Sequence, residues 1–189
     1  MHKLINFLLF QLGWFACVLG GAYGQPWLGT GIALAIVAVH LARLPRPKGE
    51  AALILAAAGT GLVWDSLLLL LGLLDYPSGI LLPNTAPLWI VAMWMLFATT
   101  LNSSMGWMQS YRKLSVVLGA LFGPLAYYAG ARLGGVILVE PVAAMAALAA
   151  GWALLMPLLL TLAQRLRGNN RVWTAAEAAI SAKGAQRHV

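Results

Sequence analysis

The chain has 189 residues, of which 61% are hydrophobic and only 9% are charged. Soluble domains carry roughly 25% charged residues, so this composition excludes a soluble globular domain. The net charge is +7, but the basic residues stand in short clusters between apolar runs, which favours a membrane protein over a nucleic-acid-binding protein.

Six apolar segments approach or exceed the roughly 20 residues that a membrane helix needs. Short runs with proline, glycine or charged residues separate these segments and predict turns. Because short connections join antiparallel neighbours, we expect an all-α polytopic membrane protein, folded as one compact bundle of six transmembrane helices. The predicted helices, in chain order, are 4–22, 27–43, 51–74, 87–108, 114–131 and 141–163.

The first segment also resembles a cleavable signal peptide, because Lys3 precedes the apolar stretch and small residues occupy 20–22. Gln11 and Trp14 interrupt its apolar core, and no soluble domain follows it. We therefore expect the segment to be retained as a helix.

The third segment contains Asp65, and an ionisable residue at membrane depth is costly and usually faces other helices. At 1.5 Å per residue, it lies roughly 20 Å along its helix, in the outer half of the bilayer. Ala58, Gly61 and Gly72 share its helical face and predict that another helix approaches closely. We therefore expect Asp65 to face protein.

Arg132 closes the fifth segment on the same side of the membrane as Asp65. The sequence thus predicts a structural ion pair between Asp65 and Arg132, with Glu140 as a competing acceptor for the arginine. The alternative is a protonated Asp65 that is only hydrogen-bonded. Either arrangement locks helices together without catalysing a reaction.

A second polar group is expected in the cytoplasmic half of the bilayer. Gln11, His40 and Asn102 stand on three different helices at one depth, so their side chains can converge on a substrate. Asn102 shares its face with Gln109 and with small neighbours that leave room beside it. For His40, the alternative is that it extends toward the interface, one turn from Arg43.

No metal or other cofactor is expected, because no second histidine, cysteine or carboxylate stands at ligand spacing beside these residues. The sequence also lacks the specific catalytic signatures, and no histidine context marks a nucleophilic serine. Packing motifs are better supported. Gly119-x-x-x-Gly123 predicts a close helix crossing, and Pro157 should bend the sixth helix.

The basic residues predict the orientation of the chain. Eleven of them fall on one side of the predicted spans and only Arg132 falls on the other, which places both termini in the cytoplasm. We expect a transmembrane domain over 1–167 and a short basic cytoplasmic tail over 168–189. Four aromatic residues fall near the predicted interfaces, as an aromatic belt requires: Trp27, Tyr76, Trp107 and Tyr127.

Several short motifs are distributed over the chain: Asn6-Phe7, Gln11-x-Gly13-Trp14-Phe15-Ala16-Cys17, Trp64-Asp65, Pro87-Leu88-Trp89, Phe97-Ala98-Thr99-Thr100-Leu101-Asn102-Ser103-Ser104 and Gly123-Pro124-Leu125-Ala126-Tyr127. Together they resemble the bacterial inner-membrane family known as domain of unknown function 2878. The resemblance covers nearly the whole chain, and its most specific part is the block around Asn102. It implies a link to membrane-lipid modification, because members tend to be encoded beside cyclopropane-fatty-acyl synthase-like and flavin amine-oxidase-like proteins.

The leading hypothesis is therefore an integral inner-membrane protein that acts as an accessory or lipid-binding component of acyl-chain or lipid modification. Its expected partners are the bilayer, membrane lipids and lipid-modifying enzymes. One alternative is a small-solute permease that carries its substrate past Gln11, His40, Asp65 and Asn102. The other is an intramembrane enzyme that uses Asp65 or His40 as acid or base.

Overall fold

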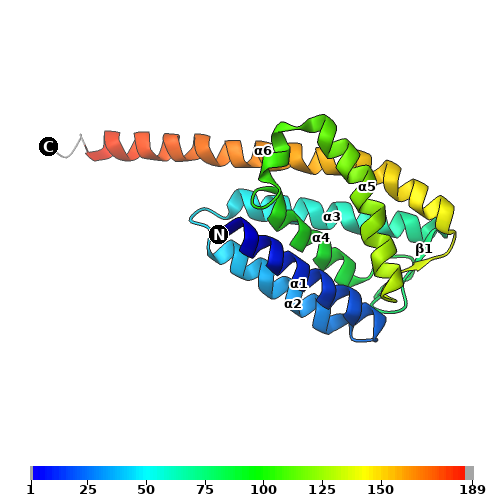
Figure 1. The fold of residues 1–189 in the computed structure, drawn as a ribbon. Helices are drawn as coiled ribbons and strands as arrows, with labels where there is room; N and C mark the ends of the chain where they lie inside the picture. The colour runs from blue at the N-terminus through cyan, green and yellow to red at the C-terminus, as the bar shows by residue number, and fades with distance from the viewer. Residues whose placement is uncertain (1, 186–189) are drawn as a thin grey trace.

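Six α-helices make up most of the chain in the computed structural model, which describes the backbone of residues 2–185 and the side chains of residues 3–167. A 3₁₀ helix, η1, and two short strands complete the fold (Figure 1). The helices are α1 (His2–Ala22), α2 (Pro26–Ala42), α3 (Lys48–Leu70), α4 (Leu88–Leu101), α5 (Arg112–Arg132) and α6 (Pro141–Ala185); η1 is Gly106–Ser110, β1 is Leu74–Asp75 and β2 is Ile137–Leu138.

Each of the six predicted helices is present, and three of them end elsewhere than predicted. Helix α3 stops at Leu70 because Gly72 adopts a φ of +66°, a left-handed conformation that closes helices and suits glycine. Gly72 therefore does not share the helical face of Asp65. Helix α6 continues to Ala185, so the segment predicted as a tail continues α6 up to that residue, and 186–189 lie outside the described residues.

Helix α4 ends at Leu101, seven residues before its predicted end. The hydroxyls of Thr99 and Thr100 donate to the carbonyls of Leu96 and Phe97, at 2.7 Å each. Such local bonds compete with helix continuation. A turn and η1 follow, and this irregular stretch brings polar side chains to one end of the bundle.

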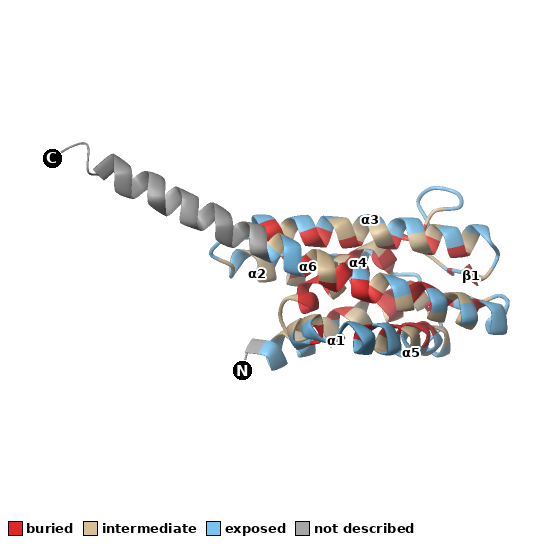
Figure 2. Ribbon diagram, turned by 90° about the horizontal axis from the view of Figure 1, so that it is seen from above, coloured by how far each residue is buried: buried red, intermediate tan, exposed pale blue. Residues whose placement is uncertain are grey.

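Four helices are long and apolar enough to cross a membrane: α1, α3, α5 and α6 up to Arg167. Helices α2 and α4 are shorter, with 17 and 14 residues. Many large apolar residues are exposed. Figure 2 shows the exposed positions mainly on the outward faces of the helices and the buried positions mainly on the faces toward the interior. An apolar exterior of this kind is what a lipid-facing bundle requires, and the chain is accordingly a membrane protein.

Helix α4 lies at the centre of the bundle. It packs against α1, α2 and α3, while α5 pairs with α6 and α3 also contacts α6. Nine of the residues of α4 are buried, more than half of the helix. A helix enclosed in this way contributes most of its side chains to the core.

Glycines allow tryptophans to enter the helix contacts. A Cβ at Gly61 of α3 would collide with the Trp94 ring, and a Cβ at Gly119 or Gly123 of α5 would collide with α6 at Trp152. The Trp94 and Trp152 rings stack with centroids 4.8 Å apart and an interplanar angle of 12°. The close crossing predicted from Gly119-x-x-x-Gly123 is confirmed. The close approach of another helix that was predicted at Gly61 is also confirmed, because α4 contacts this position through Trp94.

Strands β1 and β2 join the two connections at one end of the bundle. Leu74 pairs with Leu138 and Asp75 pairs with Ile137 in an antiparallel register. The N–H of Val139 extends this contact by donating to the carbonyl of Leu73 at 3.1 Å. The α3–α4 connection is thereby held against the α5–α6 connection.

Candidate functional site

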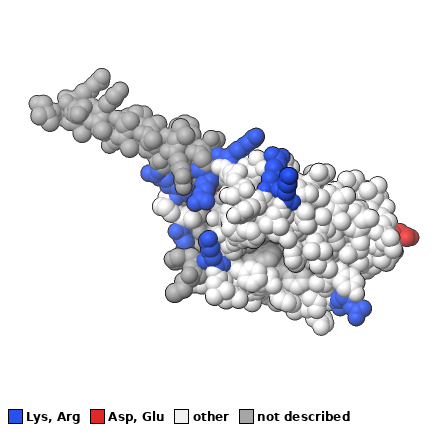
Figure 3. Space-filling model, turned by 45° about the horizontal axis from the view of Figure 1, so that its top comes forward, with Lys and Arg blue, Asp and Glu red and all other residues white. Residues whose placement is uncertain are grey.

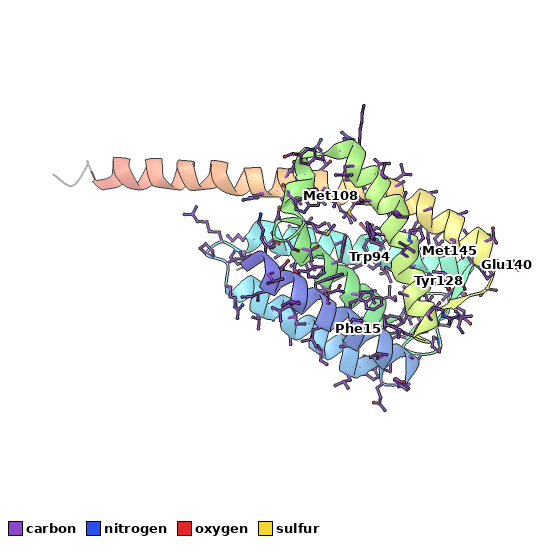
Figure 4. All side chains as sticks on the ribbon, viewed as in Figure 1. Phe15, Trp94, Met108, Tyr128, Glu140 and Met145 are labelled. Atoms are coloured by element: carbon purple, nitrogen blue, oxygen red, sulfur yellow. The ribbon has the colours of Figure 1, made fainter. Side chains whose placement is uncertain are left out.

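Asp65 lies in the core, where its side chain is wholly inaccessible to solvent. Three donors surround its carboxylate: the Tyr76 hydroxyl at 2.7 Å, the Trp94 indole N–H at 2.8 Å and the Tyr127 hydroxyl at 2.6 Å. These four residues are called the Asp65 cluster. Figure 4 shows Trp94 among the helices at the centre of the bundle.

The Asp65 cluster combines a helix–helix contact with a folded-back loop. Trp94 and Tyr127 come from α4 and α5, whereas Tyr76 follows β1. Burial raises the pKa of Tyr76 well above its ordinary value, and the nearby Asp65 carboxylate adds to this effect, so the phenol keeps the proton that it donates. Each donor around the carboxylate is therefore satisfied, and the cluster is built for stability.

The predicted ion pair between Asp65 and Arg132 does not form in the part of the chain that the structure describes. Arg132 is exposed at the end of α5, while three neutral donors fill the space around Asp65. Burying the charged arginine would carry a large desolvation penalty, and neutral donors stabilise the carboxylate without that penalty. Tyr76 and Tyr127 are 4% and 8% exposed, so they belong to this core and not to the predicted aromatic belt.

A second cluster forms where α2, α3 and α4 meet at the opposite end of α3. The two carboxylate oxygens of Glu50 contact His40 Nε2 at 3.1 Å and the Asn102 side-chain amide at 2.8 Å. Gln109 of η1 donates to Asn102 Oδ1 at 2.9 Å. These four residues are called the Glu50 cluster. It differs from the Asp65 cluster in exposure, because the His40 and Glu50 side chains are 15% and 10% accessible.

The end of α4 positions this cluster. Asn102 caps α4, and η1 carries Gln109 back toward the same point, where its amide also donates to the Leu101 carbonyl at 2.8 Å. Asn6 of α1 fixes the turn between them, because its side chain accepts from the Ser104 hydroxyl at 2.8 Å. The early end of α4 is thus what makes the Glu50 cluster possible.

The structure brings two of the four predicted site residues together. His40 and Asn102 meet through Glu50, so the imidazole is held by a carboxylate instead of extending toward the interface. Asp65 belongs to the other cluster. Gln11 is half-buried on α1 and forms no side-chain hydrogen bond to any described residue.

Sequence reasoning missed Glu50, the residue at the centre of the second cluster. It falls between the second and third predicted helices, 27–43 and 51–74, yet it stands in the first turn of α3 and is only 9% exposed. One signal was available. Glu50 is the single acidic residue beside Arg43, Arg46 and Lys48, and it directly precedes an apolar run.

Exposed basic residues surround the end of the bundle that holds the Glu50 cluster. Figure 3 shows most of the blue side chains toward one end of the molecule, and an acidic side chain with one further blue patch toward the opposite end. This basic end comprises Lys3, Arg43, Arg46, Lys48, Arg112, Lys113, Arg165 and Arg167, all of them exposed.

A cavity of about 130 Å³ opens at the basic end between η1, α5 and α6. Gln109 lines it and links it to the Glu50 cluster through Asn102. Arg112 and Gln164 also line it. Within the described residues, no three His, Cys, Asp or Glu side chains gather as metal ligands would.

Comparison with known proteins gives one result. The family model described as "Protein of unknown function (DUF2878)" matches residues 3–158, which confirms the resemblance seen in the sequence. No curated protein and no solved structure matches the chain. Since the match covers most of the sequence, the chain belongs to the DUF2878 family.

Proposed function

We propose that all six helices cross the bacterial inner membrane, with both termini in the cytoplasm. Four helices have the required length and hydropathy. Helix α4 spans only about 21 Å at 1.5 Å per residue, against a hydrocarbon core of about 30 Å. Enclosure by α1, α2 and α3 offsets this deficit, because η1 and the loop before α4 continue the crossing against protein.

The orientation rests on the basic end. Positively charged residues are retained on the cytoplasmic side of inner-membrane proteins, and eight exposed ones gather here. Reporter fusions after Gly24, Ser78 and Gly134 should report the periplasm, and fusions after Gly49, Lys113 and Gly168 should report the cytoplasm. A periplasmic signal from the fusion at Gly168 would overturn this topology.

We infer that the protein is a lipid-binding component of membrane-lipid or acyl-chain modification, and that it recognises phospholipid headgroups at its basic end. The observation that carries this proposal is the position of the Glu50 cluster, a partly accessible polar group beneath a rim of exposed cations. Cations at a membrane surface attract lipid phosphates, and partly accessible amides can orient a headgroup.

A permease is less well supported by this arrangement. It needs polar groups along a route through the bundle, but wholly buried apolar residues separate the Glu50 cluster from the Asp65 cluster: Leu53, Ile54, Ala57 and Leu96. The Asp65 carboxylate is wholly inaccessible and already accepts three hydrogen bonds from protein side chains, so a solute does not reach it.

Comparative lipidomics tests the proposed lipid role. A deletion strain should show an altered phospholipid or acyl-chain profile, and the intact gene should restore it. Asn102→Ala should be present at normal levels and fail to restore the profile, because it breaks the bond to Glu50. Gln11→Ala is the matched control, since it removes an amide at a similar predicted depth that has no role in the cluster. An unchanged profile in the deletion strain would contradict the proposal.

A second candidate, an intramembrane enzyme, is favoured by one observation. Glu50 holds His40 Nε2 at 3.1 Å, and a carboxylate-held imidazole is a common general base. The same lipidomics separates the two functions. His40→Gln keeps a hydrogen-bonding side chain, so a lipid-binding component should retain most of its effect, whereas an enzyme should lose all of it.

A further inference from the structure

The cavity at the basic end is lined by hydrogen-bond acceptors and by one arginine. Its polar lining consists of Gln109 from η1, Arg112 and Ser115 from α5, and Thr161 and Gln164 from α6, and Pro157 and Leu160 contribute to an apolar wall. Only Gln109 belongs to the Glu50 cluster. The cavity is therefore a separate binding volume that touches the cluster through one side chain.

The hydroxyls that line the cavity already donate their protons to backbone carbonyls. Ser115 Oγ donates to the Arg112 carbonyl and Thr161 Oγ1 donates to the Pro157 carbonyl, both at 2.7 Å. A hydroxyl has one proton and two lone pairs, so what each retains is acceptor capacity.

Gln109 is restricted in the same way. Its side-chain nitrogen donates both protons, one to the Leu101 carbonyl at 2.8 Å and one to Asn102 Oδ1 at 2.9 Å. The Oε1 atom accepts no hydrogen bond from a described residue.

Ser115 is only 1% exposed, so its hydroxyl belongs to the wall and is not offered to a ligand. The Gln164 side-chain nitrogen donates to the Gln109 carbonyl at 2.8 Å, and its Oε1 atom accepts no hydrogen bond from a described residue. Gln109, Thr161 and Gln164 thus contribute three acceptors to the lining.

Arg112 supplies the complementary group. It is the only charged residue that lines the cavity, it is exposed, and its guanidinium meets no acceptor within the described part of the chain. A guanidinium with free donors binds phosphate oxygens, in bidentate fashion where geometry allows. A ligand that satisfies the whole lining must therefore carry both an anion and a group rich in N–H or O–H donors.

We propose that this cavity binds the headgroup of a phospholipid with a primary ammonium, of which phosphatidylethanolamine is the representative. The ammonium has three N–H donors for the three acceptors of Gln109, Thr161 and Gln164, and the phosphate lies against Arg112. Phosphatidylcholine has the same charges but no N–H donor. This inference rests on the proposed lipid-binding function and names its headgroup.

The test measures lipid retention by native mass spectrometry of the full-length protein in detergent. Phosphatidylethanolamine, phosphatidylcholine and phosphatidylglycerol with identical acyl chains are titrated separately. Phosphatidylethanolamine should bind at least about tenfold more tightly than phosphatidylcholine, because the loss of even one of the three charge-assisted hydrogen bonds costs about that factor. Equal binding of these two lipids, or tighter binding of phosphatidylglycerol, would overturn the assignment.

Variants locate the site. Thr161→Val should reduce the preference for phosphatidylethanolamine over phosphatidylcholine several-fold. Its matched control is Thr60→Val, because the Thr60 hydroxyl makes the same bond to the carbonyl four residues earlier, at 2.8 Å, on α3. Gln164→Leu, at an exposed lining position, provides an independent test if Thr161→Val lowers the melting temperature. A preference that survives both substitutions would place the lipid elsewhere.

Arg112→Gln should weaken both lipids alike and leave their ratio unchanged, because both carry the phosphate. Arg132→Gln, at the other end of the same helix, should change neither. Two failures can be told apart. Tight binding without headgroup preference contradicts the ammonium site and leaves the lipid-binding function in place, whereas no specific retention of any phospholipid contradicts both.

Discussion

The two polar clusters of the bundle solve the same problem in different ways. Each places a carboxylate among apolar helices, and each stabilises it with side-chain donors. The Asp65 carboxylate is fully buried and receives three neutral donors. The Glu50 carboxylate is 10% accessible and is shared between His40 and an amide.

This difference separates structure from function. A carboxylate that is wholly inaccessible and already accepts three hydrogen bonds is closed to a ligand, so its role is to specify how α3, α4 and α5 pack. A partly accessible cluster that ends beside a cavity can exchange partners with a ligand. Ionisable residues in membrane bundles are functional candidates by default, and here accessibility decides between two of them.

Asp65→Leu should have the largest effect on stability. It removes one acceptor and leaves three buried donors unpaired, which costs about 3–5 kcal/mol and should prevent normal accumulation in the membrane. Thermal unfolding in detergent measures the loss. Glu140→Gln is the control, because that carboxylate is exposed at the end of the molecule, as Figure 4 shows. Normal melting of Asp65→Leu would remove the distinction between the clusters.

Adjacent tyrosines allow a finer comparison. Tyr127→Phe removes one of the three donors to Asp65 and should cost about 1–3 kcal/mol. Tyr128→Phe deletes the same hydroxyl from the next residue, which is 48% exposed, and should leave melting unchanged. Equal melting of the two variants would show that the Asp65 cluster does not depend on Tyr127.

Glu50→Gln should have the smallest effect on stability. The partly accessible cluster can be rehydrated or rearranged, so the expected cost is below about 1 kcal/mol in the same melting assay. Its effect on the phospholipid profile should nevertheless exceed that of Tyr127→Phe expressed at the same level. A melting loss as large as that of Asp65→Leu would make the Glu50 cluster a second structural site.

Much of the fold could be predicted because hydropathy and turn residues act locally. The six apolar segments and their antiparallel order follow from those signals, and so does the burial of Asp65 beside Gly61. The early end of α4 could not be predicted in this way. Thr99 and Thr100 stand inside an apolar run, where the sequence gives no sign of a helix end. Their hydroxyl bonds to the preceding carbonyls end α4 only because distant side chains hold the turn that follows.

The site was harder to predict, because its partners are distant in sequence. Asp65 contacts Tyr76 only after the chain folds back from β1. Opposite charge alone predicted Arg132 as the partner of Asp65. His40 and Asn102 were identified as polar residues at one depth, and the structure brings both to Glu50. The carboxylate that joins them could not be singled out in this way, because Glu50 lies between two predicted helices and beside three basic residues.

The stacked indoles of Trp94 and Trp152 give the contact between α4 and α6 a spectroscopic signal. Two nearly parallel rings with centroids 4.8 Å apart couple their electronic transitions, and an asymmetric protein environment makes such coupling optically active. Near-ultraviolet circular dichroism, which is lost when fixed side-chain packing is lost, therefore includes a contribution that depends on α6 packing against α4. The packing of these two helices can thus be followed with intrinsic chromophores, without any attached label.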